Sequence, residues 1–170
     1  MKIKTIVALI DLTEGTKTIV EYAKAAALAF QSKLTLLHVL TNQPVVVDIG
    51  IASPTFFLEP TAGQKKEHHD RLAQIRDSLA ASGIEVSAEE FQGVPVEELL
   101  PECRRLHADL IVMGAHHRNI LDQLVFRSVS HRVLHEAVCP ALVVPIAKSA
   151  EGSTSGTQED ISIPASKNTP

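Results

Sequence analysis

Two kinds of segment follow one another along the chain. Short, continuous apolar runs rich in β-branched residues are typical of strands that are buried on both faces. Longer segments in which apolar side chains recur every three or four positions are typical of amphipathic helices. The pattern predicts five strands, at residues 4–10, 33–40, 84–91, 108–114 and 141–146. It predicts four helices, at residues 14–32, 64–83, 96–107 and 128–137.

This alternation predicts a doubly wound α/β fold, in which a five-stranded parallel sheet lies between helix layers as in Rossmann-like and flavodoxin-like proteins. The runs 4–10 and 108–114 are apolar throughout, so they should be neighbouring central strands. Segment 84–91 alternates and segment 141–146 is short, which favours edge positions for both.

Ligands of such folds bind at the carboxyl ends of the strands, where strand order reverses. The loops after Ile10, Val39 and Met113 should therefore converge on a site.

Three segments depart from the simple pattern. Pro101 lies inside helix 96–107 and should kink or break it, because proline lacks the backbone donor. Residues 41–63 form a connection longer than most loops, and we expect its Phe56 and Phe57 to cover the edge of the core. Residues 148–170 are rich in Ser, Thr, Gly and Pro, which predicts a disordered tail after a single domain at 1–147.

Composition narrows the class of protein. The chain has 170 residues, of which 45% are hydrophobic and 21% charged, as in ordinary globular proteins. A net charge of -4 argues against a nucleic-acid partner. No apolar run reaches membrane-spanning length, so we expect no membrane partner and a cytoplasmic location. The two cysteines form neither a disulfide framework nor a CxxC motif.

The stretch "GAHHRNILDQLVFRSVS", residues 114–130, joins the fourth predicted strand to the fourth predicted helix. The N-terminus of a helix presents unpaired N–H groups and partial positive charge, which attract phosphate. Ser128 suits the N-cap position, and its hydroxyl is equally suited to a phosphate.

The order of elements, the run "DLIVMGAHH" and the ending "SVSHRVLHEAVCPALVVPI" resemble the universal stress protein family. Asp11 after the first strand and "LLHV" at 36–39 also fit, and the resemblance covers residues 1–147. It implies a homodimeric cytoplasmic stress-response protein. The nucleotide-binding branch carries Gly-x2-Gly-x9-Gly-Ser/Thr and binds ATP or a related adenine nucleotide, with Mg²⁺ accompanying ATP and at most weak hydrolysis.

This chain keeps the length of that motif but only part of its composition. Gly114 stands at the first glycine position, His117 at the second and Arg127 at the third, followed by the hydroxyl of Ser128. His117 either fills the triphosphate volume or donates to a phosphate when protonated. Arg127 either clamps a phosphate or occludes the pocket. The resemblance implies further nucleotide-binding residues: Leu9, Asp11, Val39, Met113, Gly114, Val129 and Ser130.

For these residues the resemblance places Leu9 and Asp11 beside the ribose and base, Val39 beside the adenine, and Met113 with Gly114 on the pocket floor. A plainer role for Asp11 is that of a turn or N-cap acceptor.

Three alternatives to nucleotide binding stay open. The first alternative is a zinc site, because four histidines lie close in sequence: His116, His117, His131 and His135. The last two share a helix face, a spacing that can bind zinc. No third ligand is fixed by the spacing, and solvated histidines explain the pattern better. For hydrolysis, Ser128 near His131 is the one candidate pair. The main alternative function is a dimeric interaction module that binds no nucleotide and acts on a protein partner. In either case strand 141–146 is predicted to pair across a twofold homodimer.

Overall fold

The computed structural model describes residues 2–46, 55–116 and 129–146. The strands of its larger sheet are β1 (Thr5–Ile10), β2 (Lys33–Leu40), β5 (Val86–Gln92), β6 (Leu110–His116) and β7 (Ala141–Ile146). The helices are α1 (Thr16–Phe30), α2 (Ala62–Ala80), α3 (Pro95–Arg105) and α4 (Val129–Glu136). Each predicted strand and helix is present, with ends shifted by no more than three residues. Ser128 and residues 147–170, including the predicted tail, lie outside the described residues.

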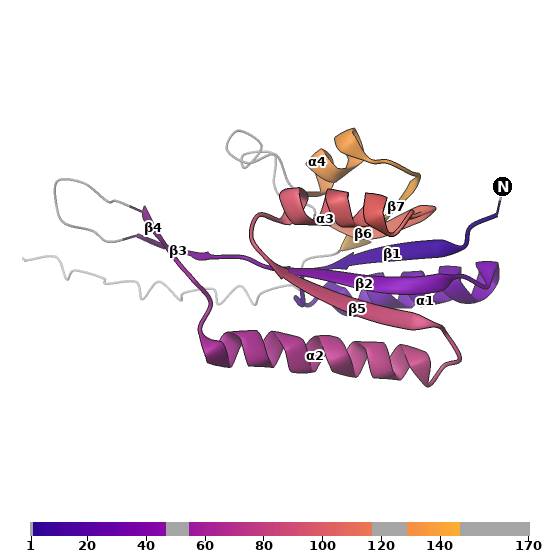
Figure 1. Ribbon diagram of the computed structural model, residues 1–170, viewed down its shortest axis with the longest axis horizontal. Helices are drawn as coiled ribbons and strands as arrows, with labels where there is room; N and C mark the ends of the chain where they lie inside the picture. The colour runs from indigo at the N-terminus through magenta and orange to yellow at the C-terminus, as the bar shows by residue number, and fades with distance from the viewer. Residues whose placement is uncertain (1, 47–54, 117–128, 147–170) are drawn as a thin grey trace, which may run out of the picture.

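The five strands form one parallel sheet in the order β5-β2-β1-β6-β7, which confirms the predicted fold class. β1 and β6 are neighbours at the centre, and β5 and β7 are the edges. Helices α1 and α2 cover one face of the sheet, and α3 and α4 cover the other (Figure 1). The carboxyl ends of β2, β1 and β6 therefore lie side by side.

The side chains of β1 explain its uninterrupted apolar run. Ile6, Ala8 and Ile10 belong to the core under α1 and α2. Val7 and Leu9 belong to the core under α3 and α4. Because both faces of a central parallel strand are covered, apolar residues are needed at successive positions rather than at alternate ones.

Pro101 was predicted to kink or break its helix, and the break does not occur. α3 continues through Pro101 to Arg105. Pro101 has no backbone N–H to donate to the carbonyl oxygen of Glu97, one turn earlier. Both residues lie on the exposed side of the helix, where water can donate to that oxygen instead. The opposite side of α3 is anchored by buried apolar residues such as Leu99 and Leu100, which hold the helix in place.

The long connection is not a simple loop. It contains an antiparallel hairpin of β3 (Gln43–Val46) and β4 (Thr55–Leu58). The hairpin projects beyond the carboxyl ends of the larger sheet (Figure 1). Phe57 is 68% exposed, so the expectation that it covers the edge of the core is wrong. The side chain of Phe56 lies outside the described residues.

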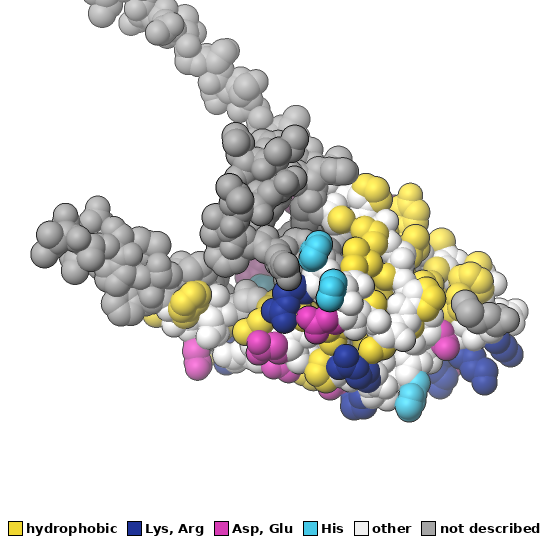
Figure 2. All heavy atoms as spheres, turned by 90° about the horizontal axis from the view of Figure 1, so that it is seen from above, with side chains coloured by type: hydrophobic (Ala, Val, Ile, Leu, Met, Phe, Trp, Pro, Cys, Tyr) yellow, Lys and Arg dark blue, Asp and Glu magenta, His cyan; other side chains and the backbone are white. Residues whose placement is uncertain are grey.

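Apolar side chains also remain exposed near the β7 edge. Figure 2 looks onto the face covered by α3 and α4, where apolar side chains gather toward one side. Leu134 on α4, Val138 in the following turn and Leu142 on β7 are the exposed large apolar residues of this part of the chain. An exposed apolar edge is suited to pairing with another strand.

Two glycines make room for the last residue of β7. A Cβ atom on Gly114 would lie 2.3 Å from Cδ1 of Ile146 and 2.8 Å from Cδ1 of Ile19. A Cβ atom on Gly15 would lie 2.4 Å from the same Ile146 methyl group. The Ile146 side chain is thus held between β6 and the start of α1, where a side chain at either glycine would displace it.

We expect Gly114→Ala to lower the free energy of unfolding by about 1–3 kcal/mol, because the added methyl group overpacks this contact. Denaturant unfolding followed by circular dichroism measures the effect. Gly63→Ala is the matched control, since its nearest neighbour would be Oγ1 of Thr61 at 3.8 Å. Adding Ile146→Val, which removes the clashing methyl group, should restore part of the loss. Unchanged stability of Gly114→Ala would contradict this packing.

Candidate functional site

Three of the predicted site residues meet at the carboxyl end of the sheet. Leu9 pairs in register with Leu37 on β2 and with Met113 on β6. Leu9, Val39 and Met113 are 7%, 9% and 3% exposed and belong to one cluster on the α3/α4 face. We call these three residues the apolar wall. Residues from three adjacent strands thus line one patch, at the place where doubly wound folds bind ligands.

Asp11 follows β1 directly and organises the turn that leads into α1. Its Oδ1 accepts hydrogen bonds from the Thr13 amide at 3.0 Å, the Thr13 hydroxyl at 2.7 Å and the Thr16 hydroxyl at 3.3 Å. Asp11 therefore fills the turn role that the sequence offered as its plainer alternative.

The same turn contains an unusual backbone conformation. Leu12 has a φ of 59°, in the left-handed region that glycine prefers, although its side chain is buried. Such a conformation costs on the order of 1–3 kcal/mol and persists only where its surroundings impose it. The hydrogen bonds to Asp11 on one side and the buried Leu12 side chain on the other supply that constraint. Strain of this kind concentrates at ligand sites and switches.

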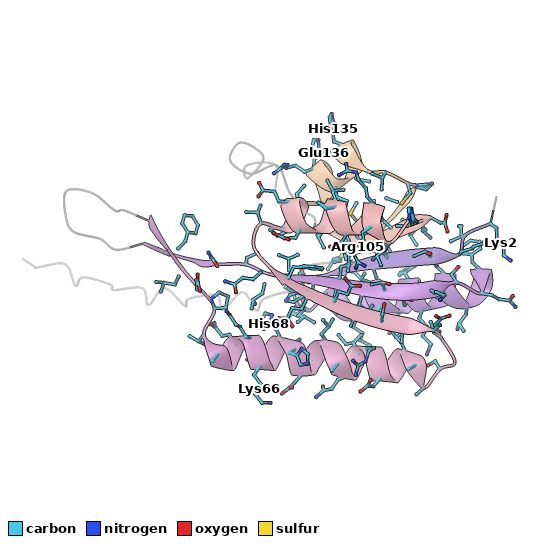
Figure 3. All side chains as sticks on the ribbon, viewed as in Figure 1. Lys2, Lys66, His68, Arg105, His135 and Glu136 are labelled. Carbon is cyan, nitrogen blue, oxygen red and sulfur yellow. The ribbon has the colours of Figure 1, made fainter. Side chains whose placement is uncertain are left out.

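A buried histidine that the sequence analysis did not identify supports this turn from β2. His38 is 2% exposed, and its Nδ1 lies 3.0 Å from the carbonyl oxygen of Ile10. Its Nε2 lies 2.9 Å from Nδ1 of His68 on α2. Figure 3 shows His68 between α2 and the sheet, whereas Lys66 extends from the outer side of the helix. We call these two residues the histidine pair.

The carbonyl determines how the protons of the pair are arranged. A carbonyl oxygen only accepts, so His38 Nδ1–H donates to Ile10 and His38 Nε2 must accept from His68 Nδ1–H. Burial lowers the pKa of His38 below 6.5, against the opposing effect of the Ile10 carbonyl. Nearby His68 lowers that pKa further, while Glu90 and Asp11 raise it. His38 is therefore neutral near pH 7.

The phosphate end of the predicted site is only partly described. His117, Arg127 and Ser128 lie outside the described residues, and of Val129 and Ser130 only the backbone, at the start of α4, is described. Gly114 lies within β6, which continues two residues beyond the predicted end of the strand, to His116. The space above Gly114 is taken by Ile146, so packing explains this glycine without any phosphate.

Of the other candidate residues, His117, Ser128 and the side chain of His116 lie outside the described residues. His131 and His135 lie exposed on α4, and His135 is on its outer side (Figure 3). Among the described residues, no three His, Cys, Asp or Glu side chains gather closely enough to hold a metal ion. Burial raises the pKa of the Cys103 thiol to about 12, so this cysteine is a poor nucleophile. Within residues 2–46, 55–116 and 129–146, no helix is long and apolar enough to span a bilayer.

A groove lies on the face of the sheet that α1 and α2 cover. This groove of about 490 Å³ runs between α1 and α2 and begins at Thr13 and Thr16 of the Asp11 turn. Val20 and Ile75 are among its lining residues, together with charged side chains of both signs. The Asp11 turn thus stands between two possible ligand positions, the apolar wall on one face and this groove on the other.

Residues 2–145 match the family model of the universal stress protein family. The chain is 32% identical over 143 residues to the universal stress protein in the QAH/OAS sulfhydrylase 3'region of Thermus aquaticus, covering 83% of this chain and 98% of that one. It is 29% identical over 135 residues to universal stress protein MJ0531 of Methanocaldococcus jannaschii, covering 78% of each.

Solved structures share the fold at lower identity. A universal stress protein in complex with cAMP superposes with a TM-score of 0.63 at 18% identity, over 85% of this chain and 98% of that one. The universal stress protein of Archaeoglobus fulgidus in complex with dAMP gives 0.58 at 15% identity, over 83% and 96%. The family model matches nearly the whole described domain, and the fold agrees with it. The chain belongs to the universal stress protein family.

Proposed function

We propose that this protein binds an adenine nucleotide at the carboxyl ends of β1, β2 and β6 and acts as a stress-response regulator. The observation that carries the proposal is that Asp11 directly follows β1, two residues after Leu9 of the apolar wall. An apolar surface suits a flat purine base, and a nearby carboxylate suits ribose hydroxyl donors. Ligand sites commonly combine a mostly apolar lining with a few fixed polar groups in this way.

The family members with bound ligands support a site for an adenine nucleotide. One family member is described in complex with cAMP and another in complex with dAMP. Both ligands carry adenine, a sugar and a single phosphate. Recognition of that common part requires a surface for the base, for which the apolar wall is the candidate here. cAMP keeps only the 2′-hydroxyl of its sugar and dAMP only the 3′-hydroxyl, so the contact from Asp11 to a sugar hydroxyl is argued from this chain alone.

The phosphate end is where this chain differs from the nucleotide-binding motif. The loop from β6 to α4 leads to a helix N-terminus, which favours an anion. His117 and Arg127 stand where two of the three motif glycines would be. We therefore expect AMP, ADP and ATP to compete on similar terms, with Mg²⁺ accompanying ATP through its phosphate oxygens. We expect at most weak hydrolysis.

Asp11→Asn should weaken AMP binding by roughly 10- to 100-fold, as expected when a hydrogen bond to a charged group is lost. Asparagine keeps one oxygen for the turn but replaces the other with an amide that cannot accept from ribose. Isothermal titration calorimetry measures the affinity. Asp70→Asn is the control, because Asp70 pairs with Lys66 on the outer surface of α2. Equal affinities of Asp11→Asn and wild type would remove Asp11 from the site.

Replacing His117 and Arg127 together by glycine tests the phosphate end. If the two side chains act as steric plugs, the double variant should bind ATP more tightly relative to AMP than wild type does. If Arg127 clamps a phosphate, ATP affinity should fall, because a charge-assisted contact is lost. Competition calorimetry with AMP, ADP and ATP distinguishes these cases. A wild type that already binds ATP far more tightly than AMP would contradict the expected crowding.

The β7 edge favours a second candidate function, that of a dimeric interaction module. Leu142 is 37% exposed on an edge strand, beside exposed Leu134 and Val138. Pro145 lacks one donor but is tolerated on an edge. We propose that Ala141–Ile146 pairs antiparallel with the same strand of a second copy. Dimerisation is compatible with nucleotide binding, and it is the remaining function if no nucleotide binds.

Light scattering during size-exclusion chromatography tests the dimer. The wild type should have the mass of a dimer at micromolar concentration, and Leu142→Lys should shift it toward monomer, because a charge would be placed at the strand edge. Leu28→Lys is the matched control, since Leu28 is a similarly exposed leucine on α1. A monomeric wild type, or equal effects of the two variants, would reject this interface.

A further inference from the structure

The histidine pair has no part in the proposed nucleotide contacts, yet it is bonded to the residue that precedes Asp11. His38 donates to the carbonyl of Ile10, the last residue of β1. His68 is bonded to His38 from α2, 30 positions further along the chain. A chain of hydrogen bonds thus runs from α2 through β2 to the start of the Asp11 turn.

The geometry limits how many protons the pair can hold. When both rings are neutral, His68 donates to His38, and each polar atom between them is satisfied. One added proton is compatible with this contact, because a donor still faces an acceptor. Two added protons would set N–H against N–H at a 2.9 Å separation, with two like charges on adjacent rings. The doubly protonated pair must therefore separate.

Other charged groups near the pair come from three elements. Glu90 on β5 and Asp11 after β1 both favour a proton on His38, and His68 on α2 opposes it. His69, next to His68, is largely exposed and lies 3.7 Å from Glu90. The two carboxylates do not overcome burial, which is the largest influence on the pKa of His38 and lowers it.

We infer that His38 is a positioning residue for the Asp11 turn, and that the histidine pair couples the conformation of that turn to α2 and to proton binding. The strained Leu12 backbone needs constraint from both sides. After Leu12, the hydrogen bonds from Thr13 and Thr16 to Asp11 hold the turn in place. Before Leu12, the hydrogen bond from His38 to the Ile10 carbonyl holds the end of β1. Separation of the pair in acid would loosen the second constraint.

The direction of the pH effect follows from the lowered pKa of His38. In the unfolded chain a histidine takes up its proton near pH 6.5, whereas folded His38 resists protonation to lower pH. The stability contributed by neutral His38 is therefore present above about pH 6.5 and is lost as the pH falls below that value. The next expectation rests on the proposed function. If the nucleotide needs the ordered turn, the same coupling makes it bind less tightly in acid, and nucleotide binding releases protons from the protein.

The test is a pH titration of the ligand-free protein by nuclear magnetic resonance between about pH 5 and pH 8. Amide resonances of Asp11, Leu12 and Thr13 should shift with the same midpoint as the ring nitrogens of His38. In His68→Asn this transition of the turn should disappear, because asparagine still donates to His38 but cannot become charged. His69→Asn, the neighbouring control, should keep the transition.

Two results would overturn the inference: turn amides that stay still while the His38 ring titrates, or a transition that His69→Asn removes as readily as His68→Asn. AMP titrations of the same proteins add a separate readout. From neutral to acid pH, wild-type affinity should fall by about fivefold or more relative to the affinity of His68→Asn at the same pH, because protonation of His117 and of the AMP phosphate affects both proteins alike. If AMP binds none of the proteins, the proposed function fails, but the ligand-free titration still decides the coupling.

Discussion

Burial of β1 on both faces is the constraint on which the rest of the structure depends. Its side chains enter two separate cores, so the strand must be apolar at successive positions and must have hydrogen-bonded neighbours on both sides. The chain then has to leave the middle of the sheet and enter α1 within a few residues. Asp11 makes this possible by accepting three hydrogen bonds from the turn, at the cost of a left-handed Leu12.

The candidate site is a consequence of the same constraint. A central strand that ends between two neighbours leaves three carboxyl ends together, and the apolar wall is the part of one core that reaches this edge. On the other face, Ile146 fills the space above Gly114 and Gly15. Helix α2 reaches the end of β1 through His38. Polar and apolar groups from four segments distant in sequence thus converge on one short turn.

The sequence was sufficient to predict those features of the fold that depend on the residue pattern of a single strand or helix. Uninterrupted apolar runs identified β1 and β6 as central, and weaker patterns identified β5 and β7 as edges, as the sheet order confirms. Helix propensity rules misjudged Pro101, because the packing of Leu99 and Leu100 outweighs one missing hydrogen bond. The hairpin in the long connection was missed because its two strands are only four residues each.

Contacts between residues that are far apart in the sequence could not be predicted from the sequence pattern. "LLHV" is simply a strand, and nothing in the sequence connects His38 with His68. Likewise, Gly114 matches a phosphate-loop glycine by spacing, while its packing against Ile146 appears only in three dimensions. Position in a motif and position in space therefore give different roles for the same residue.

The most direct test of the account is a map of methyl and backbone resonances during titration with AMP. The central claim is that one ligand site lies at the apolar wall and the Asp11 turn. The account predicts that resonances of Leu9, Asp11, Val39 and Met113 shift together and saturate with one dissociation constant, while Val20 and Ile75 in the groove between α1 and α2 stay unchanged. Shifts confined to that groove, or none at millimolar AMP, would contradict it.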